Sequence, residues 1–191
     1  MQIHLPYFLN NDAKMPPSTS DCLGYSRESF KAIWQKLEGE VDKGRIINLG
    51  VSNMSIPKLK NLLEDCRIKP VNNQVELHPY LQQEELVKFC QDQGITVTAF
   101  SPLGSPDRPS KNASDENIPS LLENEVIRNI ATKHKVSAAQ VLISWALHRQ
   151  TAVIPKSATP SRIEENIASL KISLNDDDMS KINSLDKHVR N

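Results

Sequence analysis

The chain has 191 residues, a length that fits one domain of ordinary size or a piece of a larger one. Its 23 basic and 23 acidic side chains cancel, and a pI near 7.0 excludes the basic excess expected of a nucleic-acid-binding protein. No stretch approaches the roughly 18 apolar residues that span a bilayer, so we expect neither a membrane segment nor a signal peptide. The three cysteines are an odd number without CxxC spacing, which favours reduced thiols in the cytoplasm over disulfides or a metal site.

Short runs rich in apolar and β-branched residues predict five strands. In chain order these runs are residues 2–5, 46–51, 71–76, 95–100 and 151–154. Each has the length of an ordinary strand. Their largely apolar composition is typical of strands that are covered on both faces, as in parallel sheets.

Apolar residues at helical spacing predict helices between and after these strands. The stripes run through residues 30–41, 56–66, 86–90, 126–131 and 141–146. Residues suited to begin or end a helix support this pattern: the caps Ser55, Thr159 and Asn175, and the terminating glycines Gly44 and Gly94. Pro160 places the fixed backbone angle of proline in the first turn of a helix that runs through Leu170.

Strands that alternate with helices over short connections are typical of a parallel sheet with crossover helices. Two architectures have this order. A doubly wound sheet would carry a glycine-rich nucleotide fingerprint, and neither GxGxxG nor a P-loop is present. A (β/α)8 barrel needs eight units, and about five are visible here. Two irregular stretches, residues 5–26 and 101–120, have a length that is often found in functional lids.

Polar side chains follow the predicted strands at their carboxyl ends, where the chemistry of βα folds gathers. Ser52, Asn53 and Gln74 offer neutral donors and acceptors suited to a ligand that carries an amide. Phe100 offers a flat apolar face. His4 ends the first predicted strand.

Lys156, Ser157 and Arg162 surround the predicted start of a helix at Thr159-Pro160. The amino end of a helix attracts anions, and the two cations add to that attraction. These residues therefore predict a phosphate site.

Five strings, taken together, resemble the aldo-keto reductase family in order and spacing. They are Gln2–Pro6, Gly50–Asn53, Asn73–Tyr80, Ala99–Ser105 and Ile154–Ile163. The first resembles the family's fourth strand, which ends in the active-site histidine. The resemblance implies an α/β fold in which residues 1–191 form a single oxidoreductase domain, a partial (β/α)8 barrel of about five parallel βα units that is not closed. It also implies that NADP(H) binds in an extended form and that hydride passes between the nicotinamide and a small aldehyde or ketone.

The resemblance also assigns roles to individual residues. His4 would be catalytic and orient the substrate carbonyl. At the nicotinamide end of the cofactor, Ser52, Asn53 and Gln74 would bind the carboxamide, and Phe100 would stack on the ring, where similar family members have tyrosine. Ser101 and Leu103 would line the path of the pyrophosphate, and Asp107 would belong to the loop that folds over it. At the other end, Lys156, Ser157 and Arg162 would bind the 2′-phosphate, and Glu165 and Asn166 would contact the adenine.

The sequence departs from the family's pattern at three places. Leu5 replaces a tryptophan that often follows the histidine. The tetrad's aspartate, tyrosine and lysine have no counterpart here, and the end at Asn191 falls early in the family's tail, so we expect a chain truncated at both ends. An alternative is a catalytically inactive product that keeps NADP(H) affinity or associates through exposed strand edges. A complete protein is expected to be a monomer, and a second chain that completes the barrel is a third possibility.

Overall fold

A computed structural model of the protein describes residues 1–10, 12, 19–105 and 120–190. It forms two compact units, one of residues 1–75 and 85–97 and the other of residues 76–84 and 98–191. None of the helices within the described ranges has the length and apolar character needed to cross a membrane.

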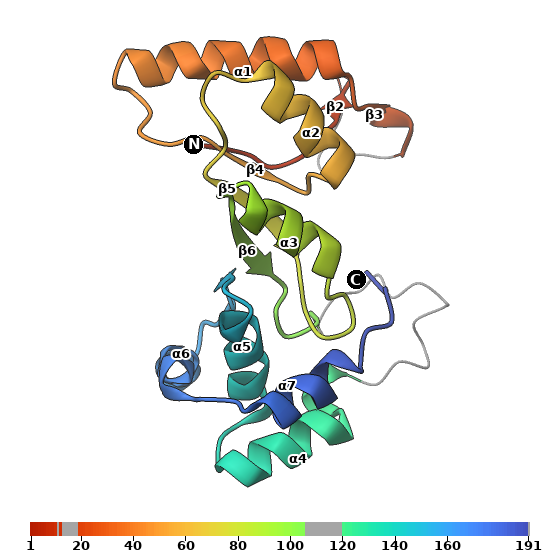
Figure 1. The fold of residues 1–191 in the computed structure, drawn as a ribbon, viewed down its shortest axis with the longest axis vertical. Coiled ribbons are helices and arrows are strands. Elements are labelled where there is room, and N and C mark those ends of the chain that lie inside the picture. The colour runs from red at the N-terminus through yellow and green to blue at the C-terminus, as the bar shows by residue number, and fades with distance from the viewer. Residues whose placement is uncertain (11, 13–18, 106–119, 191) are drawn as a thin grey trace. The chain divides into compact units, whose positions relative to one another are not determined.

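The elements follow the predicted alternation (Figure 1). The strands are β1 (Gln2–Ile3), β2 (Phe8–Leu9), β3 (Cys22–Gly24), β4 (Gly50–Ser52), β5 (Asn72–Glu76), β6 (Thr96–Phe100) and β7 (Ala152–Val153). The α-helices are α1 (Arg27–Asp42), α2 (Ile56–Asp65), α3 (Glu84–Asp92), α4 (Glu125–His134), α5 (Ala138–His148), α6 (Pro160–Ala168) and α7 (Asp176–Asn183). Short 3-10 helices are η1 (Thr19–Asp21), η3 (Leu121–Glu123) and η4 (Ser169–Lys171).

Five of the strands form one parallel sheet in the order β1-β4-β5-β6-β7. The register pairs Gln2 with Gly50, Val51 with Asn73, and Thr98 with Ala152. Parallel neighbours joined by helical crossovers are the repeating unit of a (β/α)8 barrel. The order has β1 and β7 at its ends, which confirms the predicted partial barrel of five parallel strands that does not close.

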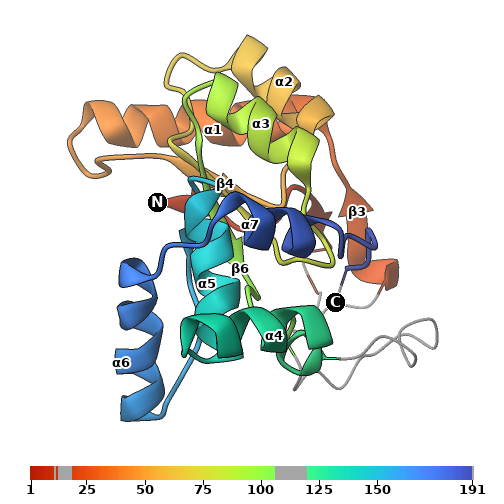
Figure 2. The ribbon, with the colours of Figure 1, turned by 60° about the horizontal axis from the view of Figure 1, so that its bottom comes forward.

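In the first unit, a long amphipathic helix covers the core. Ser26 caps α1 by accepting a hydrogen bond from the amide of Ser29, and Gly44 follows the helix with a φ of +70°. Phe30 and Trp34 point inward, and the indole N–H of Trp34 donates to the carbonyl of Ile68 at 3.0 Å. Helix α2 packs beside α1 (Figures 1 and 2). Burying a side chain of this size contributes about 1.5–3 kcal/mol, so this stripe fixes α1 in place.

In the second unit, α5 is the central helix and packs against α4 and α6 (Figure 2). Its residues Val141 to Ala146 are all buried. Helix α6 differs, because none of its residues is buried. Helix α7 begins with a reciprocal capping box between Asn175 and Asp178, as the predicted helix start at Asn175 requires.

Two predictions of local structure are wrong. The strand expected at residues 46–51 begins only at Gly50, and Ile47 is 88% exposed, because β-branched residues form a strand only where a partner strand and a core are present. The stretch at 5–26, expected as an irregular loop, contains the antiparallel pair β2–β3, in which Phe8 pairs with Gly24.

Candidate functional site

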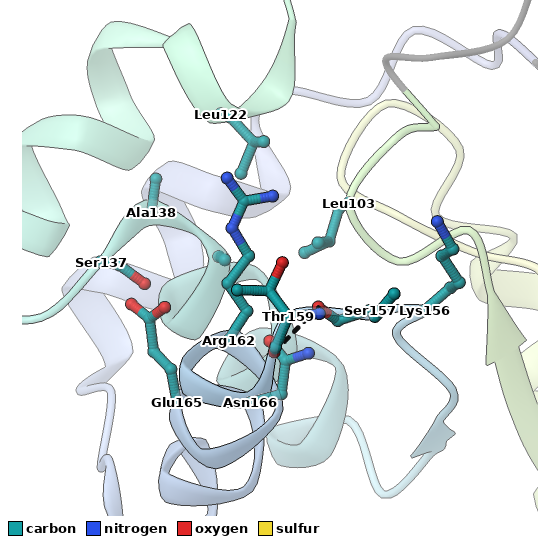
Figure 3. Close-up of a pocket in the computed structure, with 12 residues that line it drawn as sticks. Leu103, Leu122, Ser137, Ala138, Lys156, Ser157, Thr159, Arg162, Glu165 and Asn166 are labelled. Atoms are coloured by element: carbon teal, nitrogen blue, oxygen red, sulfur yellow. Dashed lines mark hydrogen bonds between the residues drawn. The ribbon is translucent and has the colours of Figure 1, made fainter.

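A pocket of about 420 Å³ lies in the second unit, between the amino ends of α5 and α6 (Figure 3). It gathers six of the residues expected at the cofactor site: Leu103, Lys156, Ser157, Arg162, Glu165 and Asn166. They come from the connection after β6, from the connection between β7 and α6, and from α6 itself. The remaining lining residues are Leu122, Ser137, Ala138, Ala139, Ala158 and Thr159.

The connection from β7 to α6 places the helix start at the pocket. Thr159 is the N-cap and Pro160 the first helical residue, as expected. The hydroxyl of Ser157 accepts a hydrogen bond of 3.1 Å from the backbone N–H of Thr159 and donates to its carbonyl (Figure 3). The Thr159 side chain forms no capping hydrogen bond. The first N–H groups of α6 therefore have no side-chain cap, and they carry the positive end of the helix dipole.

The pocket has an excess of positive charge. Lys156 and Arg162 are both exposed, and their side chains stand on either side of Leu103 (Figure 3). Neither forms an ion pair within the described part of the chain. Among the described residues that line the pocket, Glu165 is the one acidic residue, and its carboxylate points toward Ser137 (Figure 3). Two cations without partners beside a helix start can bind a phosphate monoester.

The other lining residues suit a flat group with a polar edge. Leu103 and Leu122 offer apolar surface. The side chains of Glu165 and Asn166 are half-buried and make no hydrogen bond to a described residue, so the amide of Asn166 keeps both donors and acceptor. The pocket can therefore take a ring system next to a phosphate.

Phe100 and Ser101, which were also expected at the cofactor site, do not line this pocket. The carbonyl of Phe100, the last residue of β6, accepts a hydrogen bond of 3.2 Å from the N–H of Leu77. Ser101 has a φ of +51°, and its hydroxyl accepts a hydrogen bond of 2.7 Å from that of Ser105. Such a backbone angle is uncommon outside glycine and clusters at functional sites. Asp107 lies outside the described residues.

In the first unit, the other predicted residues gather where β1, β4 and β5 end. The hydroxyl of Ser52 donates to the carbonyl of Gln74 at 2.7 Å, and the backbone N–H of Asn53 donates to the same oxygen at 2.9 Å. The side-chain amide of Asn53 donates to the carbonyl of His4 at 3.0 Å and to the Ser52 hydroxyl at 3.2 Å. The structure thus brings His4, Ser52, Asn53 and Gln74 together.

These hydrogen bonds leave other polar groups of the same residues available to a ligand. Both donors of the Asn53 amide are used, which leaves its carbonyl oxygen to accept from a ligand. The Gln74 side chain is half-buried and has no hydrogen bond to a described residue. The exposed ring of His4 adds a further donor or acceptor. A carboxamide or a carbonyl matches this set.

Residues that the sequence patterns did not single out support these positions. Asn73, which is fully buried, donates to the carbonyl of Met54 at 3.0 Å and accepts from its N–H, so it fixes the backbone beside Asn53. Ser137 and Gln140 form a capping box at the start of α5, beside the pocket. The pattern Ser-x-x-Gln was the available signal for this box. Within the described residues, no group of three or more potential ligands is arranged to hold a metal ion.

Comparison with known proteins places these features in a family. The model of the aldo/keto reductase family matches residues 1–187. An aldo/keto reductase of Synechocystis sp. is 46% identical over 190 residues, which are 98% of this chain and 57% of that protein. Aldo-keto reductase family 1 member A1 of Gallus gallus is 39% identical over 189 residues, with the same two shares.

A solved structure shares the fold. MGS-M4, an aldo-keto reductase enzyme from a Medee basin deep-sea metagenome library, superposes with a TM-score of 0.77 at 32% identity and covers 86% of this chain and 58% of its own. The chain thus spans 57% of the length of the curated relatives. The family match over nearly all of the chain, and the parallel strands that end in these polar residues, lead to one conclusion: this chain belongs to the aldo/keto reductase family.

Proposed function

We propose that this chain binds NADP(H) and is part of an oxidoreductase that reduces small aldehydes or ketones to alcohols. Its family membership supports the reaction class. The observation that carries the cofactor assignment is the pocket in which Lys156 and Arg162, without ion pairs to described residues, lie beside the start of α6. An NAD molecule lacks the 2′-phosphate that would use these two cations, so the donor set favours NADP(H).

Each part of the cofactor has residues suited to it. We assign the 2′-phosphate to Lys156, Ser157 and Arg162, because cations and a hydroxyl are the usual ligands of a phosphate monoester. Glu165 and Asn166 are assigned to the adenine edge, and Leu103 to the pyrophosphate path. Phe100, Ser101 and Asp107 keep the nicotinamide, pyrophosphate and loop roles that the family resemblance gives them.

In the first unit, the open amide groups near His4 suit a carboxamide such as that of nicotinamide. The carbonyl oxygen of Asn53 and the side chain of Gln74 can pair with a carboxamide, which both donates and accepts. Ser52 supports them by holding the backbone of Gln74. His4 is assigned to the substrate carbonyl, where an imidazole N–H polarises the oxygen. When bound, NADPH supplies the hydride for the reduction.

Binding is the most direct test of this proposal. Purified chain is titrated with NADPH and NADH while nucleotide fluorescence is followed, and with 2′,5′-ADP and 5′-AMP by calorimetry. We expect NADPH to bind at least about tenfold more tightly than NADH, because one charge-assisted hydrogen bond contributes about 1.5–3 kcal/mol. Equal affinities, or no binding of any of the four, would overturn the proposal.

Two variants test whether the cations of the pocket cause the preference for NADPH over NADH. Lys156→Met together with Arg162→Met removes both cations and is expected to abolish the preference for NADPH. Lys171→Met is the control, since it removes a cation from the exposed end of η4, outside the pocket, and should keep the preference. A preference that survives the double variant would place the phosphate elsewhere.

Turnover is a separate measurement. No residue of this chain matches the aspartate, tyrosine and lysine of the family's tetrad, and a general acid is worth about 10²–10⁴-fold in rate. We therefore expect the purified chain alone to reduce 4-nitrobenzaldehyde slowly or not at all. Rapid NADPH consumption with this aldehyde would show that another group of the chain supplies the proton.

A further inference from the structure

Helix α6 carries three of the six proposed cofactor residues that line the pocket, but it buries no side chain. None of its residues is buried, and its apolar residues Ile163 and Ile167 are 43% and 63% exposed. Arg162, Glu165 and Asn166 nevertheless have to keep fixed positions at the pocket to bind a ligand. Hydrogen bonds from α5 therefore add to the limited packing between these two helices.

One side chain of α5 makes the connection beside the pocket. The Gln140 amide nitrogen donates to the backbone carbonyl of Glu165 at 3.1 Å. Its amide oxygen accepts from the backbone N–H of Ser137 at 3.1 Å, and the Ser137 hydroxyl accepts in turn from the N–H of Gln140. The same planar amide thus completes the start of α5 and holds α6 at Glu165. Gln140 itself does not line the pocket.

A second hydrogen bond from α5 lies one turn further along, at the residue that follows α6. The hydroxyl of Ser144 donates to the carbonyl of Ser169 at 2.9 Å, and both residues are buried. Ser169 immediately follows the helix and lies away from the pocket lining. Of these two bonds, the one at Glu165 is three residues from Arg162, whereas the one at Ser169 is seven residues from it, so loss of the Gln140 bond would remove the connection nearer to Arg162.

We propose that Gln140 is a positioning residue for the proposed NADP(H) site: it holds α6 against α5 and so keeps Arg162 and Asn166 directed into the pocket. This inference rests on the proposed function. It assigns to Gln140 no contact with the ligand, only the placement of residues that make such contacts.

The test compares Gln140→Met with Asn175→Ala. Methionine keeps the length of the side chain, carries no charge and makes neither hydrogen bond. Asn175→Ala removes a capping box of the same kind at α7, outside the pocket, and reproduces the general loss of stability. Calorimetry gives the affinities for 2′,5′-ADP and 5′-AMP, and hydrogen exchange reports on the backbone amides of residues 161–168.

We expect Gln140→Met to weaken 2′,5′-ADP binding about 3- to 10-fold, the effect of one lost hydrogen bond, and 5′-AMP binding less. Exchange at residues 161–168 should become faster in this variant and stay unchanged in Asn175→Ala. If Gln140→Met does not fold, Gln140→Glu replaces it. A carboxylate still accepts from the N–H of Ser137 but cannot donate to Glu165, and about 0.3 M salt screens its added charge.

The outcomes separate the two proposals. A wild-type chain that binds neither nucleotide overturns the proposed function. A wild-type chain that binds 2′,5′-ADP, together with a Gln140 variant of equal affinity or unchanged exchange in α6, overturns the role of Gln140 alone. An equal loss of affinity in Asn175→Ala also overturns that role, because the effect would then come from stability.

Discussion

The side-chain amide of Asn53 donates a hydrogen bond of 3.0 Å to the backbone carbonyl of His4 and so joins the ends of β4 and β1. Asn53 has a φ of +58°, in the left-handed region that asparagine tolerates better than most residues. The residue therefore has two properties that a substitution can separate: its backbone angle and its side-chain bond.

Replacing Asn53 by alanine and by glycine separates the effect of the backbone angle from the effect of the side-chain hydrogen bond. Both variants lose the bond to His4, but only alanine is strained at a positive φ. We expect Asn53→Ala to lower the free energy of unfolding by about 1 kcal/mol more than Asn53→Gly does. Urea denaturation followed by circular dichroism gives both values. Equal losses would mean that the left-handed angle carries no strain for alanine here.

Salt dependence distinguishes the two cations of the pocket from its neutral groups. Binding of 2′,5′-ADP is expected to weaken as salt rises from about 0.05 to 0.5 M, because Lys156 and Arg162 are exposed and screened. Either Lys156→Met or Arg162→Met should reduce both the affinity, by about tenfold or more, and the dependence on salt. Asn166→Ala should reduce affinity and leave the salt dependence in place. Calorimetry at four salt concentrations measures both quantities.

Asp178 is expected to make stability depend on pH. Burial opposes its ionisation, but hydrogen bonds of 2.7 Å from Lys133 and from His134 outweigh burial and lower the pKa of Asp178 below its ordinary value of 3.8. Because the folded-state pKa is the lower one, the contribution is present above about pH 4 and is lost as the pH falls through the folded-state pKa.

We expect Asp178→Asn to lower the free energy of unfolding by about 1.5–3 kcal/mol at pH 7, the range for a charge-assisted hydrogen bond. The difference from wild type should shrink below pH 3.8. Asp176→Asn, at the exposed start of the same helix, is the control. Urea denaturation at pH 7, 5 and 3 measures the difference, and a gap of constant size at all three would contradict the assignment.

The carboxyl of Asp65 gives a second pH measurement. Hydrogen bonds from Arg27, at 2.7 Å, and from Lys31 lower the pKa of Asp65 to about 2. Arg27→Met should raise that pKa toward 3.8, while Arg67→Met, which removes the partner of Asp42, should leave it unchanged. Carbon-detected NMR titration reads the carboxyl directly.

Thiol reactivity should follow burial. Cys22 is exposed, Cys66 is half-buried and Cys90 is fully buried. Burial raises the pKa of both Cys66 and Cys90, so less of each is present as the reactive thiolate. We expect Ellman's reagent to modify Cys22 first and Cys90 only on unfolding. Cys22→Ser should remove the fast phase, and a fast phase that persists would identify Cys66 as the reactive thiol.

Sequence patterns predicted the elements whose formation depends mainly on neighbouring residues. The runs at 71–76 and 95–100 became β5 and β6 nearly in full, and Gly44 and Gly94 take the positive φ expected after a helix. The run at 46–49 is also rich in apolar and β-branched residues but lies outside the sheet, because pairing depends on residues far away in the chain. No local pattern distinguishes these cases.

At the candidate site, too, groups close together in the sequence were predictable, and contacts between distant residues were not. The groups of Lys156, Ser157 and Arg162 were predictable because they follow one strand and begin one helix. The bond from Gln140 to Glu165 joins residues 25 apart and depends on how α5 and α6 pack, which no short pattern encodes. The residues of the proposed cofactor site could be named from the sequence, whereas Gln140, the proposed positioning residue, could not.

The exposure of α6 also bears on how this chain can change over evolutionary time. Because no side chain of residues 160–168 takes part in the core, mutations there escape the selection against misfolding that restrains interior positions. If α6 binds the ligand as proposed, its preference can change through substitutions at a few neighbouring residues of this helix. Substitutions on this helix can therefore change the proposed ligand contacts with little effect on the core.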